Sequence, residues 1–344
     1  MEKNKALRDL GLRVYSNKMI TKEENGVMVN QDEKEIIEIC NKTFGHGTPS
    51  PENLHLFNQF LVETAEVIAK PRVDAVLGLL ADVETVPAGA VKIYTLPKTT
   101  EPKFMYTAKG TGVDLVRLSG GETKKVAVPQ SMTYGGYYEI TTFRADPVKA
   151  FREAIDRLAT AKVEYYFDKV YDIVQKALSN SDVPTNNKKS GSNLTLADFQ
   201  KIEQTMIRLT NGRPVFIGDM ALINHFANLI PTTQKDLLTD EIRDMLREEL
   251  IPTKISKTIA VNMPNKWIDD ANSKVRFDTK TGFMFPGAVS GKKPFVISEF
   301  GAKRQYSEID PETEEVKIKI VFESDVTLLN GRYLGIIKDD SVVI

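Results

Sequence analysis

The sequence predicts a mixed α+β fold, and three observations predict it. A long amphipathic helix is expected over residues 146–179, a strand-rich stretch without helical pattern precedes it over residues 89–136, and strands alternate with helices after residue 190. A strand-rich stretch followed by a long helix is typical of α+β proteins, and the alternation after residue 190 predicts an α/β domain within that fold. At 344 residues the chain is long enough for two compact units.

The first 88 residues divide at a break rich in glycine and proline, Gly45–Pro51. Residues 1–50 are charged, with one helical patch near residues 33–39, and are expected to form an irregular arm. Apolar residues at helical spacing predict a helix that begins at Glu52 and continues to about Ile68. A second short apolar piece follows over residues 73–83.

Residues 89–136 have short strand-like runs separated by proline and glycine, which predicts a long two-stranded ribbon. Gly120 and Gly121 supply the backbone freedom that a tight hairpin corner needs. Seven basic residues against three acidic ones give this segment a net charge of +4. Because an isolated hairpin is marginally stable in water, the ribbon is expected to lie on another surface, either of its own chain or of a neighbouring subunit.

The clearest helix signal is Asp146 followed by Pro147, an N-cap with proline at the first helical position. Apolar residues then recur at steps of three and four as far as about Leu178. Turn-forming residues over 179–193 predict a solvated linker and a domain boundary. Beyond it, helices are expected over about 195–209, 219–229 and 239–250, and strands over 215–217, 259–261 and much of 295–344.

The sequence offers no catalytic or metal-binding cluster. The run Leu118–Glu122 is close to the signature of ABC-type ATPases, but the nearest phosphate-binding loop, Gly287–Lys293, is one residue short and has lysine where a hydroxyl is needed. The three histidines have no metal-ligand spacing, and Cys40 follows isoleucines that predict a buried thiol. We therefore expect a structural protein without cofactor or metal, and not an enzyme.

Charge and hydropathy limit the partners. The formal net charge of −1 argues against a protein that reads nucleic-acid sequence, since such proteins carry a concentrated basic face. The start of the chain has no apolar signal core, and no run of about 20 apolar residues is present, so no membrane partner is expected. A single cysteine excludes an intrachain disulfide and fits folding in a reducing cytoplasm.

The order of these parts resembles the major capsid proteins of tailed bacteriophages, a fold shared with encapsulin shells. The similarity covers roughly residues 50–344. The stretches that carry it are Leu194–Phe199 followed by Arg213–Gly218, then Lys293–Ile297, and the close of the chain over Val326–Ile337.

The resemblance implies a division of the chain into named parts. Residues 1–50 would be an N-terminal arm reaching to a neighbour, and residues 89–136 an extended loop lying over an adjacent subunit. A peripheral domain would comprise residues 51–88 and 137–189, with its spine helix over 146–179. Residues 190–294 would form the axial domain, and residues 295–344 would return as strands to complete both domains.

The same resemblance implies subunit contacts through the extended loop. The side chains expected at that contact are Lys109, Arg117, Lys124 and Lys125, with Gly120 and Gly121 at the tip or a bend near it.

The function implied is a major capsid protein that self-assembles into an icosahedral shell around double-stranded phage DNA. It would be assembled in the host bacterial cytoplasm and would reside in the virion. Only about 50 residues precede the first solid helix, which favours either a separate scaffolding protein or an already processed type of capsid protein. A portal is a further expected partner. The alternatives are an encapsulin-like compartment, another virion component, and a soluble enzyme of unknown class.

Overall fold

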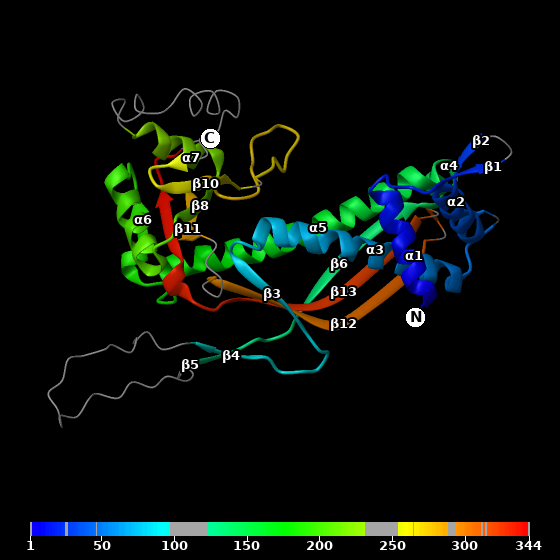
Figure 1. Cartoon of the computed structure of the whole chain (residues 1–344), viewed down its shortest axis with the longest axis horizontal. Coiled ribbons are helices and arrows are strands. Elements are labelled where there is room, and N and C mark those ends of the chain that lie inside the picture. The colour runs from blue at the N-terminus through cyan, green and yellow to red at the C-terminus, as the bar shows by residue number, and fades with distance from the viewer. Residues whose placement is uncertain are drawn as a thin grey trace.

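The computed structural model is an elongated molecule with a sheet in each half and one long helix running between the halves (Figure 1). The structure describes residues 2–24, 27–45, 47–96, 123–230, 254–263, 265–287, 293–310, 312–313 and 315–342.

A four-stranded sheet forms one half of the molecule. Its order is β3 (Ala81–Val86), β12 (Phe295–Ile309), β13 (Glu315–Leu328) and β6 (Gln130–Glu139). The β3–β12 pair is parallel and the other two pairs are antiparallel. Helices α3 and α5 lie along one face of this sheet (Figure 1). Residues 130–136, which the sequence assigns to the extended loop, are thus part of a sheet strand.

Helix α5 (Pro147–Ser179) is the long helix that the sequence predicts, and at about 1.5 Å per residue it spans about 50 Å. The Asp146 side chain accepts a hydrogen bond from the Lys149 amide and so caps its first turn. Its first half packs in the core of the four-stranded sheet and its second half in a core shared with the other sheet. The short helix α4 (Ile140–Ala145) precedes it.

Helix α3 (Pro51–Leu77) is longer than the sequence predicts, because it continues through Pro71. Proline removes one backbone hydrogen bond from a helix interior. Val73 and Leu77, on the far side of Pro71, are buried in the core shared with the second half of α5, and this burial offsets the loss.

The expectation of an irregular N-terminal arm is wrong for the part of residues 1–50 that the structure describes. Helix α1 (Glu2–Tyr15), the hairpin β1 (Thr21–Glu24) and β2 (Val27–Asn30), and helix α2 (Gln31–Phe44) are regular elements. Leu10, Val14, Ile36, Cys40 and Phe44 are buried in the core of their own chain. These apolar residues lie at helical spacing, and the surrounding charges mask the pattern.

One ion pair joins the two N-terminal helices. The Arg13 guanidinium donates to both carboxylate oxygens of Asp32, at 2.9 and 2.7 Å. Asp32 is buried, and the hydrogen bonds from Arg13 hold the pKa of its carboxyl below the ordinary value. The pair fixes the start of α2 against the end of α1.

A six-stranded sheet forms the other half. Its order is β7 (Lys188–Gly191), β14 (Gly335–Asp339), β11 (Thr281–Pro286), β8 (Pro214–Gly218), β10 (Thr258–Asn262) and β9 (Lys254–Ile255). Helices α6 (Leu196–Thr210) and α7 (Met220–Asn228) pack against it. The returning C-terminal strands therefore divide between the two sheets, β12 and β13 in one and β14 in the other. The helix predicted over 239–250 lies outside the described residues.

Close packing on this sheet depends on two glycines, Gly282 beneath Phe216 and α7, and Gly335 beneath α6. A Cβ added to Gly282 would lie 2.4 Å from the Phe216 ring, and one added to Gly335 would lie 2.6 Å from Ile202. Phe199, Phe216 and Phe226 form an aromatic cluster with ring centroids 5.1–6.4 Å apart. The missing side chains on the sheet make room for these rings.

The prediction of a solvated linker over residues 179–193 is wrong for the middle of that segment. Residues Thr185–Asn187 form a 3-10 turn (η1) and the next four residues are strand β7. Asn187 is buried and donates to the carbonyls of Arg332 and Leu334, beside a second 3-10 turn, η2 (Gly331–Tyr333). Hydrogen bonds to the end of the chain, about 145 residues away, therefore hold this segment in place.

Candidate assembly surfaces

The base of the predicted ribbon is an antiparallel pair of short strands, β4 (Ile93–Leu96) and β5 (Thr123–Val126). It projects from the body of the molecule below the four-stranded sheet (Figure 1). In its register Ile93 lies opposite Val126 and Leu96 opposite Thr123. Residues 97–122, between the two strands, lie outside the described residues.

One face of the ribbon base is anchored to its own chain. Tyr94 and Ala127 are buried against Val296 and Phe300 of β12. The Tyr94 hydroxyl and the Ser298 hydroxyl lie 2.7 Å apart, and burial raises the pKa of Tyr94. The base is therefore held firmly to the sheet.

The opposite face of the ribbon base exposes apolar side chains. Val91, Ile93, Val126 and Val128 are 72%, 51%, 49% and 60% exposed. Successive side chains of a strand point to opposite faces, so the paired Ile93 and Val126 share the face away from Tyr94, and Val91 and Val128 lie just beyond the two strands. Single exposed apolar residues are ordinary, but several on one projecting strand pair favour an interaction surface.

The candidate contact residues from the sequence lie in or beside this ribbon. Lys109, Arg117, Gly120 and Gly121 are outside the described residues. Lys124 is exposed on β5.

Lys125 is used within its own chain, where its ammonium donates to the Leu328 carbonyl at 2.7 Å. Sequence reasoning concentrated on the lysines and missed the apolar face. The alternation of Val91 with Ile93, and of Val126 with Val128, is the signal that could have found it.

A second exposed apolar site is the loop that follows β10. Trp267 is 46% and Ile268 64% exposed, so Trp267 is not the packing residue that its size suggests. Arg276 anchors the loop to α5 through Glu164 and Asp168. The Asn265 side chain donates to Asp219 at 2.8 Å and accepts from the Phe277 amide at 2.9 Å.

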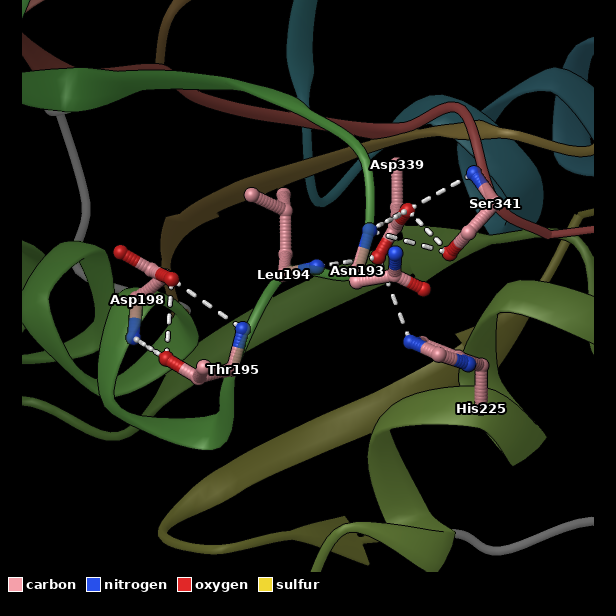
Figure 2. A network of polar contacts seen from close by, with 7 residues as sticks. All are labelled: Asn193, Leu194, Thr195, Asp198, His225, Asp339 and Ser341. Carbon is pink, nitrogen blue, oxygen red and sulfur yellow. Dashed lines mark hydrogen bonds and ion pairs between the residues drawn. The ribbon is translucent and has the colours of Figure 1, made fainter.

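A polar network joins the linker, α7 and the last strand (Figure 2). The buried Asp339 carboxylate accepts hydrogen bonds from the amides of Asn193 and Leu194 and from both the amide and the hydroxyl of Ser341. Nε2 of His225 lies 3.2 Å from this carboxylate. Burial alone would raise the pKa of Asp339, but the hydrogen bonds outweigh it and lower the pKa below its ordinary value.

The other groups of chemical interest are structural in the described chain. Burial raises the pKa of Cys40 to about 12, which suppresses the reactive thiolate. Among the residues that the structure describes, no three metal-ligating side chains form a group that could hold an ion. In the same residues, no helix is long and apolar enough to span a membrane.

The comparisons with known proteins identify the family. The family model described as "SPbeta prophage-derived putative capsid protein YonB" matches residues 6–338. A relative in Bacillus subtilis strain 168, the "SPbeta prophage-derived uncharacterized protein YonB", is 41% identical over 323 residues, which cover 93% of this chain and 95% of the relative. The chain belongs to the YonB capsid protein family.

Solved structures extend the likeness to the fold. A chain of the satellite phage P4 procapsid that includes the size determination (Sid) protein is 11% identical, with a TM-score of 0.51 over 84% of this chain and 97% of that one. The holo-SrpI encapsulin complex from Synechococcus elongatus PCC 7942 gives 11% identity and a TM-score of 0.45, over 79% and 89% of the two chains.

The predicted relationship to tailed-phage capsid proteins is confirmed, and so is the α+β class. The family and the fold together point to a structural, shell-forming role as a capsid protein.

Proposed function

We propose that this chain is a major capsid protein that self-assembles into a closed icosahedral shell enclosing double-stranded DNA. The observation that carries the proposal is the ribbon base, which is anchored on one face and exposes Val91, Ile93, Val126 and Val128 on the other. A closed shell of identical subunits uses head-to-tail contacts, in which a surface of one copy completes a different surface of the next.

In this proposal the ribbon is the extended loop that lies over a neighbouring subunit. Lys109, Arg117 and Lys124 meet acidic surface across that contact, and Gly120 and Gly121 allow the loop to bend. Each exposed ion pair contributes only about 0–1 kcal/mol, so the apolar face supplies most of the free energy of each contact. The contact repeats at every subunit of the shell.

The proposed domains follow the two sheets. The four-stranded sheet with α3 and α5 is the peripheral domain, α5 is its spine, and the six-stranded sheet with α6 and α7 is the axial domain that gathers around the symmetry axes. A formal net charge of −1 suits contact with packaged DNA without sequence recognition, because a strongly basic wall would bind the DNA too tightly. A separate scaffolding protein and a portal complete the assembly in the bacterial cytoplasm.

The test is to express the full chain, alone and with the phage's scaffolding protein, and to examine it by negative-stain electron microscopy. Closed shells or hexameric and pentameric capsomers support the proposal. A monomer that forms neither under any condition overturns it. Shells that fill with one cellular protein and never with DNA would favour an encapsulin-like compartment instead.

A matched pair of variants sharpens this test. The double variant Ile93→Ser with Val126→Ser removes two of the four exposed apolar side chains of the ribbon base and is expected to raise the protein concentration at which shells form. Met28→Ser alters an even more exposed apolar residue on β2, far from the ribbon (Figure 1), and is expected to assemble as the unaltered chain does.

A further inference from the structure

A partly enclosed pocket in the four-stranded half of the molecule carries a further inference. It lies between helices α3 and α5 and the strands β6 and β13, and its volume is about 210 Å³. An apolar cavity of about 150 Å³ takes up a benzene molecule, so this pocket has room for a somewhat larger ring system. Most of its lining is apolar and includes Val62, Ala65, Ala69, Leu158, Ala161 and Ile320.

The pocket also has a polar end. Two charged side chains line it, Glu66 of α3 and Lys162 of α5. Both also line a neighbouring hollow of about 460 Å³, whose other lining residues include Lys70, Asp74, Glu299 and Lys303. The apolar pocket therefore meets a charged hollow at Glu66 and Lys162.

One oxygen of Glu66 is a hydrogen-bond acceptor without a donor. Its Oε2 accepts from the Lys303 ammonium, whereas Oε1 is buried and has no hydrogen-bond partner in the described part of the chain. Lys162 differs, because its ammonium lies 2.8 Å from the Glu299 carboxylate. A buried acceptor without a partner is unfavourable, so the polar end favours a ligand that brings a donor.

The charges around Glu66 favour a donor without charge. In the lining of the neighbouring hollow, three lysines stand against three acids, so the balance calls for no further charge. A neutral N–H or O–H group would satisfy Oε1 of Glu66 without disturbing that balance.

The walls of the pocket favour an aromatic ligand. Tyr134, Phe322 and the thioether of Met132 are among its lining residues. Ring–ring and sulfur–ring contacts add to the free energy that a ligand gains by burying apolar surface. An aromatic ring with a single donor therefore matches both the body of the pocket and its polar end.

We propose that this pocket binds a small, uncharged aromatic molecule that carries one N–H or O–H donor and is about the size of indole. The ring lies between the two helices and the sheet, and the donor group bonds Oε1 of Glu66. Such a ligand contacts α3, α5 and the sheet together, so it stabilises the packing of these layers. The site lies within one subunit and is independent of the shell-forming function proposed above.

Isothermal titration calorimetry of the full-length chain with indole tests the site, and benzofuran is the matched probe. Benzofuran has the same fused-ring shape but carries an oxygen in place of the N–H group, so it cannot donate. We expect saturable binding of indole, and binding of benzofuran that is weaker by about two- to ten-fold, the loss that a single hydrogen bond produces. No saturable binding of indole overturns the proposal. Equal affinities for the two probes overturn it as well, because the donor would then be unused.

A pocket-filling variant tests whether indole binds at this place. Ala161→Leu enlarges a lining side chain, and we expect it to weaken indole binding by about ten-fold or more. Ala197→Leu makes the same change at an exposed position on α6 and is expected to bind indole as the unaltered chain does. Circular dichroism checks that each variant is folded. Undiminished indole binding by folded Ala161→Leu contradicts the proposed site.

Glu66→Met tests the hydrogen bond without filling the pocket. The variant keeps a side chain of similar length but lacks the acceptor, so the preference for indole over benzofuran should disappear. A preference that persists in Glu66→Met would place the donor elsewhere and overturn the proposal. Thermal unfolding gives a second readout, since saturating indole should raise the unfolding midpoint of the unaltered chain and of Ala197→Leu but not that of Ala161→Leu.

Discussion

The six-stranded sheet buries its apolar side chains, whereas the ribbon base exposes some of them to solvent. Every residue of β8 and β11 is buried, Gly282 leaves room for the Phe216 ring and Leu222 of α7, and Gly335 lets helix α6 approach closely. The ribbon base covers only Tyr94 and Ala127 and leaves the alternate side chains in solvent. The sheet buries its apolar side chains within one subunit, whereas the ribbon base leaves Ile93 and Val126 exposed in the described subunit.

The largest expected effect on subunit stability is in the six-stranded sheet. Phe216→Ala removes the ring at the centre of the aromatic cluster and leaves a cavity beneath α6. We expect the free energy of unfolding to fall by about 3–5 kcal/mol, measured by chemical denaturation. A fall in unfolding free energy below about 1 kcal/mol would show that Phe216 is not packed in a buried core.

The next largest effect on stability is expected in the Asp339 network of Figure 2. Asp339→Asn replaces one of the two carboxylate oxygens that accept from the Asn193 and Leu194 amides, and we expect the free energy of unfolding at neutral pH to fall by about 1–3 kcal/mol. Because the folded pKa of Asp339 is lowered, its contribution is present above the unfolded pKa of about 3.9 and is lost as pH falls through the folded pKa.

The measurement is the unfolding free energy of both proteins against pH. Their difference should be constant near neutral pH and should shrink below about pH 4. A difference that grows on acidification would contradict the assigned direction of the pKa.

A pair of glycine variants compares the stability effects of a buried position in the six-stranded sheet and an exposed position on strand β6. Gly282→Ala forces a methyl group into the Phe216 ring, and we expect a loss of about 1–3 kcal/mol. Gly135→Ala meets no atom, and removing a glycine from a strand should leave stability unchanged or raise it by about 0.5–1 kcal/mol. Equal losses of unfolding free energy in the two variants would contradict the conclusion that Gly282 is crowded and Gly135 is not.

The smallest expected effect on the subunit is at the ribbon base. Ile93→Ser with Val126→Ser should change the free energy of unfolding by no more than about 0.5 kcal/mol, because both side chains are already exposed. The same variant should raise the protein concentration needed for assembly, measured by light scattering. A large loss of subunit stability would show that the outer face is buried within its own chain.

The sequence predicted the parts of the fold whose signals are local. Asp146 and Pro147 mark the start of α5, and its apolar residues repeat over more than eight turns. Strand β7 has the sequence KKSG, with no apolar residue, and it is a strand because β14, far along the chain, pairs with it. Helix α1 likewise depends on a distant contact, since Gly11 packs against Thr64 and Phe60 of α3.

The ribbon base likewise has some features that the local sequence predicts and others that depend on distant residues. The prolines, glycines and alternation of residues 89–136 predicted strands, and the described parts of that range contain β4, β5 and the start of β6. Which face of the ribbon is covered was not visible, because Val296 and Phe300, which cover Tyr94, lie about 200 residues further along. The edge position of β6 depends in the same way on the order of strands drawn from both ends of the chain.

The central claim is that the outer face of the ribbon base is an interface between subunits. A cryo-electron microscopy reconstruction of the assembled particle tests it most directly. The account predicts that Ile93 and Val126 of each subunit lie buried against a neighbouring copy. Density in which both side chains face solvent around the whole particle would contradict it.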